Sequence, residues 1–332
     1  MISRNRLEDL LQRLSQLTIG LLGDLFLDQY LEVSAELQEH SIETGLESYQ
    51  VGGVRNSPGA LGTVAKNLAT LGVGTVKPLT VIGDDGRGAD LLRCLEQWGI
   101  QTDWVVREPG RLTPTYAKPM QHHGDGRPPT ELNRIDIRTR GPLLPESSGK
   151  LANVLKQHFD ECDGWIVLDQ VNEVGWGVID DLVIQTLCQQ TKANPNKFVM
   201  VDSRQRLVDF SDSILKGNDV EITAAAGIAD PVEATTRLAQ RTGRPVICTC
   251  GADGIWLGDP DAPPTHAQGR RIEEPIDIVG AGDMVSATLT AIYLAGGSLL
   301  EAADCANLAA SIAVKKLGTT GEATPSELII CH

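Results

Sequence analysis

Residues 277–283 join a loop of small residues to a carboxylate, a combination that could transfer a phosphoryl group. The segment reads Asp-Ile-Val-Gly-Ala-Gly-Asp and opens an apolar stretch with helical character. The amides of Gly280, Ala281 and Gly282 can approach a ligand closely, and the positive end of a helix favours an anion. Asp283 would then lie beside the reacting centre, where a carboxylate can take a proton from a hydroxyl. In isolation, an ordinary strand-to-helix turn with Asp283 as N-cap fits about as well.

Two other carboxylates follow the first apolar run of the chain. A strand predicted at 18–24 ends in Gly-Asp, and Asp28 follows Asp24 after three further residues. Ligands gather at the carboxyl ends of strands in open α/β sheets, and carboxylates accept hydrogen bonds from hydroxyls, so both are candidate contacts for a polyol. Cations that could meet an anionic group of the substrate or of ATP are Lys118, Arg134 and Arg204. Each of these cations, taken singly, also fits a surface charge.

Helical patterns alternate with apolar strands along most of the chain, which predicts a mainly parallel sheet covered by helices on both faces. The expected helices are 5–17, 60–71, 283–295 and 299–317, with another ending at Trp98. The expected strands are 18–24, 75–82, 164–169, 197–202, 219–223, 245–249 and 254–257. We therefore expect one α/β domain over residues 1–332.

Two stretches depart from this alternation of helices and apolar strands. Residues 28–56 and 104–137 alternate polar and apolar side chains without a helical face, so they predict strands outside the main core. Residues 122–129 are rich in Gly, Pro and polar side chains and predict a solvated hairpin loop. Together the two stretches predict a small β lid, which could also meet a second subunit and form a homodimer.

The composition argues against some classes of binding partner. The chain has 332 residues and a formal net charge of −15, which argues against binding nucleic acid or an anionic membrane surface. An anionic ligand would need a local basic pocket. The seven scattered cysteines favour a reducing cytoplasm. We expect neither a membrane span nor a signal peptide, because no apolar run approaches the length of a membrane helix and the first residues precede no signal-type core.

Five motifs occur in the order found in the ribokinase-like (PfkB) family of sugar kinases, which this chain resembles from about residue 18 to 328. They are Gly23-Asp24 with Leu27-Asp28-Gln29-Tyr30, the turn at 83–88, Asn218-x-x-Glu221, the segment 249–254 and the segment 277–283. Within that family the chain is most similar to bacterial heptose-phosphate kinases. This closer resemblance depends on residues 23–30, on Arg134-x-Asp136 and on the segment 314–319.

The resemblance implies a ribokinase-like fold and assigns roles to single residues. Asp283 would be the catalytic base, and the amides of Gly280, Ala281 and Gly282 would stabilise charge on the transferring group. Asn218 and Glu221 would organise Mg²⁺ through water near the ATP phosphates, although a strand-end Asn and a surface Glu would look the same. The family's nucleotide loop matches Thr249, Gly251 and Gly254.

Two further assignments concern the nucleotide base and a cation. Asn307 would line the adenine pocket, and an Asn on a helix surface is about as consistent with its spacing. Asp277 and the loop around Gly318 resemble a monovalent-cation site, so K⁺ is a candidate beside ATP and Mg²⁺.

The sugar side departs from the family pattern. The family's substrate helix begins Gly-Gly-Ala-x-Asn, and this chain has Gly59 followed by Ala60, with Thr63 in place of the Asn. The heptose kinases carry Arg where this chain has Gln29. After the central strand Asp169 is kept, but the family's Lys is lost. The substrate contacts implied are Asp24, Asp28, Gly59, Thr63, Arg134 and Asp169. Loss of an Asn and two cations suggests the hypothesis of a neutral or differently charged acceptor.

The sequence therefore predicts an ATP-dependent kinase for a sugar or a sugar phosphate. The first alternative is a non-catalytic regulator that binds sugar or nucleotide on the same scaffold. A second alternative is a kinase for an acceptor other than a heptose. A dinucleotide-dependent oxidoreductase is disfavoured, because the first strand is not followed by Gly-x-Gly-x-x-Gly.

Overall fold

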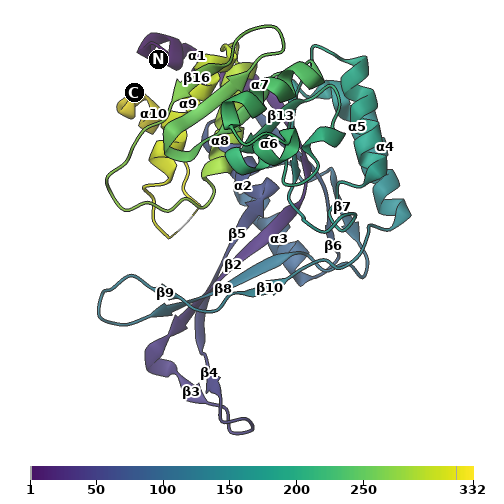
Figure 1. The fold of residues 1–332 in the computed structure, drawn as a ribbon. Coiled ribbons are helices and arrows are strands. Elements are labelled where there is room, and N and C mark those ends of the chain that lie inside the picture. The colour runs from purple at the N-terminus through teal and green to yellow at the C-terminus, as the bar shows by residue number, and fades with distance from the viewer. Residues whose placement is uncertain (1, 319) are drawn as a thin grey trace.

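A large, mostly parallel sheet forms the centre of the molecule (Figure 1). The computed structural model describes residues 2–318 and 320–332. Within these residues nine strands run in the order β16-β15-β14-β13-β12-β11-β1-β6-β7, parallel except where β15 and β16 join antiparallel. Their bounds are β1 Thr18–Gly23, β6 Thr75–Gly83, β7 Val105–Glu108, β11 Gly164–Asp169, β12 Phe198–Ser203, β13 Ile214–Asn218, β14 Val246–Thr249, β15 Gly254–Gly258 and β16 Thr265–Gln268.

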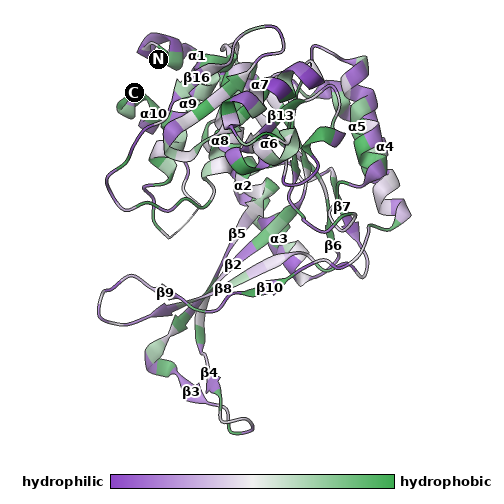
Figure 2. Cartoon of the chain, viewed as in Figure 1, coloured by the Kyte–Doolittle hydropathy of each residue, from purple (hydrophilic) through white to green (hydrophobic). Residues whose placement is uncertain are grey.

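The strands of the large sheet are buried on both faces, which explains why they appear in the sequence as short apolar runs. In β11, Ile166 and Leu168 pack into one hydrophobic cluster, whereas Trp165 and Val167 pack into the other. The first face is covered by α1 Arg4–Arg13, α2 Leu61–Thr70, α3 Gly86–Gln97, α8 Ala281–Leu294, α9 Leu299–Ala313 and α10 Pro325–Cys331. The second is covered by α4 Pro145–His158, α5 Asp181–Ala193, α6 Asp219–Ala226 and α7 Pro231–Thr242. Hydrophobic and hydrophilic residues alternate along α4 and α5, as expected of helices with one buried face (Figure 2).

A second sheet projects from the core as the lid (Figure 1). Its strands are β2 Leu25–Ser34, β5 Val51–Ala60, β8 Thr115–His122 and β10 Ile135–Ile137, in the order β10-β8-β2-β5. β9 Thr130–Glu131 pairs with β8, and β3 Glu39–His40 and β4 Glu47–Ser48 form a small ribbon at the far end. Because only Asp24 separates β1 from β2, the lid emerges directly from the carboxyl edge of the large sheet.

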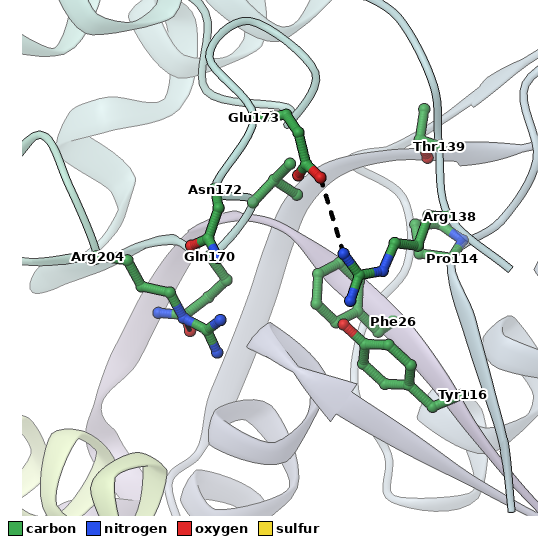
Figure 3. A pocket seen from close by; sticks show the side chains of 10 residues that line it. Phe26, Pro114, Tyr116, Arg138, Thr139, Gln170, Asn172, Glu173 and Arg204 are labelled. Atoms are coloured by element: carbon green, nitrogen blue, oxygen red, sulfur yellow. Dashed lines mark hydrogen bonds and ion pairs between the residues drawn. The ribbon is translucent and has the colours of Figure 1, made fainter. Parts of the chain in front are cut away.

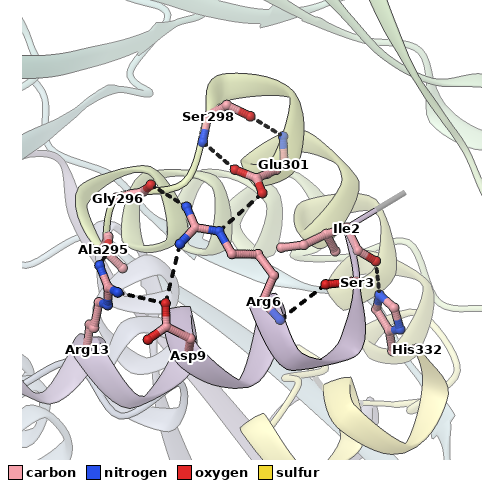
Figure 4. Close-up of polar contacts among 10 residues, drawn as sticks. All are labelled: Ile2, Ser3, Arg6, Asp9, Arg13, Ala295, Gly296, Ser298, Glu301 and His332. Atoms are coloured by element: carbon pink, nitrogen blue, oxygen red, sulfur yellow. Dashed lines mark hydrogen bonds and ion pairs between the residues drawn. The ribbon is translucent and has the colours of Figure 1, made fainter.

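The chain ends lie close together, and polar contacts fix the first helix to the last ones (Figure 4). The guanidinium of Arg6 donates to the carbonyl of Gly296 at 2.7 Å and to carboxylate oxygens of Glu301 and Asp9, each at 3.3 Å. Arg13 donates to the same Asp9 oxygen at 2.7 Å. These contacts hold α1 against the turn between α8 and α9, and α8 carries the candidate catalytic residue.

Three boundaries differ from those expected. Residues 219–223, predicted as a strand, begin helix α6, because Asn218 caps its amino end and the strand stops there. The alternation of polar and apolar residues at 219–222 imitated a strand, but the Ala run that follows favours a helix. Residues 105–108, expected in the lid, form the edge strand β7 of the large sheet. The last long helix, expected to reach residue 317, ends at Ala313.

Candidate active site

Helix α8 begins in the small-residue loop with open backbone amides. Gly280 is its N-cap with a φ of 81°, in the left-handed region that favours glycine. Among the described residues the amides of Gly280 and Gly282 find no acceptor, whereas Ala281 donates to the carbonyl of Ile278 at 3.2 Å. No atom lies within 4 Å of a Cβ placed on Gly282, so internal packing does not require glycine there. The arrangement leaves two amides and the helix dipole for an external anion.

Asp283, in the first turn of α8, is surrounded by other charges. Burial and then the negative charge of Asp202 raise the pKa of Asp283 to about 7, while Lys216 and Arg204 oppose the rise and Asp28 adds to it. Its carboxylate makes no hydrogen bond to the other described residues. A free carboxylate with a pKa near neutrality is well matched to the task of a general base.

A buried ion pair lies next to Asp283 at the ends of β12 and β13. Lys216, which is 3% exposed, donates to Asp202 at 2.5 Å, and the two residues are register partners. Burial opposes charge on the lysine, but Asp202 outweighs it and raises the pKa of Lys216, so the ammonium persists. Lys216 also interacts electrostatically with Asp283 and with Glu221, so a fixed positive charge lies near both carboxylates.

Asn218 and Glu221, the two residues expected near Mg²⁺, form a capping box at the start of α6. The Glu221 amide donates to Asn218 Oδ1, and the Asn218 amide donates to Glu221 Oε2, both at 2.8 Å. Burial raises the pKa of Glu221. No cluster of three or more His, Cys, Asp or Glu in the described part of the chain could hold a metal. One carboxylate and one amide suit a Mg²⁺ ion that keeps most of its waters.

The sugar side centres on Asp28, a buried residue of the lid strand β2. Its carboxylate pairs with Lys118 of β8 at 3.3 Å. Burial opposes charge on Lys118, but Asp28 and Tyr30 outweigh it and raise its pKa. A Cβ on Gly59 would lie 3.1 Å from Asp28 Oδ2, so glycine leaves room for this carboxylate. Thr63 is buried beside the catalytic loop, since its Cγ2 lies 3.6 Å from a Cβ built on Gly280.

Asp24 and Asp169 lie where β1 and β11 end side by side and the strand order reverses. Asp24 accepts the amides of Gln170 and Val171 at 2.8 and 3.1 Å and that of Val178 at 2.8 Å. It thus holds the loop after β11, and burial raises its pKa. Asp169 accepts two bonds from Arg206, at 2.7 and 3.1 Å. Both carboxylates are committed to protein partners here, and a role of either in sugar binding stays a prediction.

The expected nucleotide loop lies at the antiparallel end of the sheet. Thr249 ends β14 and donates to the carbonyl of Gly217 at 3.3 Å, next to Asn218. Gly251 and Gly254 have φ values of 54° and 99°, and a Cβ on Gly254 would meet the Ala267 carbonyl at 2.2 Å. Gly254 is therefore required by the tight turn itself, while the approach of a nucleotide stays a prediction.

Asn307 and Asp277 make structural contacts of their own. Asn307, buried on α9, donates to the carbonyls of Ala267 and Gln268 at 2.9 and 3.2 Å and so anchors β16. Asp277 accepts the amide of Gly318 at 3.2 Å, and its own amide donates to the Val314 carbonyl. The structure thus brings together the two segments expected to form a monovalent-cation site.

Arg134, the third cation considered, lies at the edge of the lid. Its guanidinium donates to both carboxylate oxygens of Asp136, at 2.6 and 2.9 Å, and stacks 4.5 Å from the centre of the Tyr116 ring. Tyr116 lines a pocket between the lid and the loop after β11 (Figure 3). Arg134 therefore supports the wall of this pocket.

The sheet order, the lid and the position of α8 are those of the ribokinase-like fold. The structure of Arabidopsis thaliana ribokinase complexed with ribose and ATP superposes with a TM-score of 0.67 at 17% identity, covering 95% of this chain and 98% of the other. Residues 178–326 match the model of the pfkB family of carbohydrate kinases.

Curated relatives extend the match to the whole chain. The bifunctional protein HldE of Trichlorobacter lovleyi is 32% identical over 351 aligned residues, and that of Pelobacter propionicus is 30% identical over 344. Both alignments include 99% of this chain, which spans 65% of the first relative and 66% of the second. The chain thus spans about two thirds of the length of these relatives. In the described residues, no helix is long and apolar enough to cross a membrane.

Sequence reasoning missed several charged residues that shape the site. Lys216 interrupts an apolar strand, and a lysine in such a run signals a paired, buried charge. Asp202 lies at the end of the neighbouring strand, where the same rule that identified Asp24 would have found it. Arg206 and Arg138 left no such signal, because each occupies an irregular segment whose path depends on the tertiary structure.

Proposed function

We propose that this protein catalyses ATP-dependent phosphorylation of a sugar hydroxyl. The observation that carries the proposal is a carboxylate with a pKa near 7, at the amino end of a helix whose loop amides are open, between the large sheet and a lid. The ribokinase-like fold and the family match support it.

In the proposed reaction Asp283 takes the proton of the acceptor hydroxyl. The hydroxyl oxygen forms a bond to the γ-phosphorus of ATP, the bond from that phosphorus to the β–γ bridging oxygen breaks, and ADP leaves with the electron pair. The amides of Gly280 and Gly282, with Ala281 between them, face the oxygens of the transferring group. Lys216 supplies fixed positive charge nearby. Positioning and electrostatics are the main contributions that such a reaction needs.

Other residues would hold the two substrates. Asp28 would orient the sugar, with Gly59 and Thr63 beside it. Thr249, Gly251, Gly254 and Asn307 would border the nucleotide. Asn218 and Glu221 would bind Mg²⁺ through water, and the ion would neutralise charge on the phosphates. Asp277 and the Gly318 loop are the candidate K⁺ site, supported by their contact.

We also propose that the lid forms a homodimer interface. Its outer part exposes several large apolar side chains, among them Ile42 at 100%, Leu46 at 69% and Val54 at 58% exposed. Light scattering after size exclusion tests this proposal. A dimer that a Val54→Glu substitution converts to monomer is expected, and a wild-type monomer at micromolar concentration would refute it.

A direct test of the kinase function is ADP release from Mg·ATP in the presence of pentoses, hexoses, heptoses and their phosphates, with phosphorylated product identified by mass spectrometry. We expect at least one sugar to stimulate ADP release and to gain a phosphoryl group. If no sugar does so while ATP binds, the alternative of a non-catalytic binder is favoured.

A further inference from the structure

Helix α2, which directly follows lid strand β5, carries a nearly buried lysine. Every residue of α2 from Leu61 to Leu68 is buried, and Lys66 is 9% exposed among them. Its ammonium lies 3.4 Å from Glu322 Oε2 and 4.9 Å from the centre of the Trp98 ring. Lysine is rarely buried without a partner of opposite charge, so Lys66 depends on Glu322 in this position.

Glu322 belongs to the segment 320–322, which connects α9 to α10 and is held on two sides. Its Oε2 atom also accepts a hydrogen bond from Thr70 Oγ1 at 3.0 Å, one helical turn beyond the lysine. A Cβ on Gly321 would lie 2.0 Å from the carbonyl oxygen of Ala313, so glycine is required where the segment packs against the end of α9. The segment is therefore fixed to both α2 and α9.

Thr320, at the start of this segment, lies against the anion-binding loop. It is 6% exposed, and a Cβ built on Gly280 would lie 3.4 Å from Thr320 Cβ. The same Cβ would lie 3.6 Å from Thr63 Cγ2. Thr63, Lys66 and Thr70 are spaced three and four residues apart, so they lie on one face of α2. Gly280 thus packs against α2 and also against the segment that Glu322 ties to α2.

We infer that Glu322 is a positioning residue for phosphoryl transfer. By tying the segment 320–322 to α2, it holds Thr320 against Gly280, so that the open amides of Gly280 and Gly282 keep their direction toward the transferring group. Such donors stabilise a transition state because they are oriented in advance, and a small displacement of a positioned group lowers the rate. The inference rests on the proposed kinase function and adds to it a residue outside the sequence motifs.

The variant Glu322→Gln tests the inference with Mg·ATP and the best acceptor from the sugar screen. The amide leaves Lys66 without a charge partner and holds the segment less firmly. We expect kcat to fall by about tenfold, while the KM values for the acceptor and for ATP stay within about twofold of wild type. A merely structural role would lower thermal stability and leave the kcat of the folded enzyme unchanged. A kcat within about twofold of wild type overturns the inference.

Glu301→Gln is the matched control. The side chain of Glu301 is 28% exposed, against 26% for Glu322, and it pairs with Arg6 at 3.3 Å. Arg6 also contacts the turn after α8, at the opposite end of that helix from Gly280. The control should lose thermal stability and keep kcat within about twofold of wild type. An equal fall of kcat in both variants would trace the effect to general destabilisation and overturn the inference.

Thr320→Ala tests the route of the effect. It removes the Cγ2 atom, which lies 3.5 Å from a Cβ built on Gly280, and keeps the ion pair of Glu322. We expect kcat to fall by about three- to tenfold. Because Glu322 acts through Thr320, the double variant should lie within about twofold of the slower single variant. Losses that multiply in the double variant would overturn the inference.

The outcomes separate this inference from the proposed function. Sugar phosphorylation that is unchanged by Glu322→Gln overturns the role of Glu322 while the kinase function stands. Absence of ADP release with every sugar overturns the kinase function, and the inference with it.

Discussion

Replacing Asp283 by Asn should stabilise the protein at alkaline pH. Because burial and Asp202 raise the pKa of Asp283 to about 7, the folded state binds its proton more tightly than the unfolded chain, whose value is 3.8. The favourable contribution of the protonated carboxyl is complete below pH 3.8 and is lost as pH rises through 7. The ionised carboxylate therefore costs folding free energy at pH 8, and the neutral amide of Asn avoids that cost.

The pKa values of Asp283 in the folded and unfolded states set the magnitude of the expected stability gain. A difference of about three pH units corresponds to at most about 4 kcal/mol. Because the side chain is half-buried and screened by solvent, we expect about 1–3 kcal/mol. Urea unfolding followed by tryptophan fluorescence measures the difference from wild type at pH 8 and again at pH 5, where it should fall to about half or less.

A matched control is Asp261→Asn, an exposed position in the loop between β15 and β16, which should change stability by less than about 0.5 kcal/mol at both pH values. The reasoning would be refuted if Asp283→Asn were no more stable than wild type at pH 8, or if its gain were the same at pH 5.

Three further predictions follow from charges in the structure. The value of kcat/KM should rise with pH through about 7 and be about tenfold lower at pH 6 than at its plateau, because the base must be ionised; a profile flat from pH 5.5 to 8 would contradict this. Lys216→Met should cost about 2–4 kcal/mol in urea unfolding by leaving the partly buried Asp202 carboxylate unpaired, and adding Asp202→Asn should recover part of the loss; a double variant as unstable as the single one would argue against the pair. Arg6→Gln should destabilise by about 1–2 kcal/mol, more than Arg4→Gln, which loses a single surface pair; equal effects in thermal unfolding would refute the role of the Arg6 contacts.

Local patterns in the sequence predicted most of the fold. The alternation of apolar strands and amphipathic helices gave the mainly parallel sheet, and the lid followed from stretches that alternate polar and apolar residues. The wrong prediction of a strand at 219–223 has a physical cause. Asn218 caps a helix, and the Ala run that follows favours a helix more strongly than the short alternation of polar and apolar residues favours a strand. Assignment of 105–108 to the lid failed because edge strands of the two sheets look alike in sequence.

The site was predictable where function depends on backbone and short motifs. Residues 280–283 lie together because they are consecutive and begin a helix. The charges around Asp283 were harder to predict from the sequence. Asp202, Lys216 and Arg204 lie in or just after strands that become neighbours only through the sheet order. Asp24 shows what a local motif cannot predict. Its motif suggested a sugar contact, but its three amide bonds depend on the path of a loop far along the chain.

The central claim is that Asp283 is the base that activates a sugar hydroxyl. Single-turnover phosphoryl transfer from Mg·ATP to the best acceptor, compared between wild type and Asp283→Asn, tests it most directly. We predict a rate lower by about 10²–10⁴-fold in the variant, with the Kd for ATP within about threefold of wild type. A variant that transfers the phosphoryl group at a rate within about twofold of wild type would contradict the account.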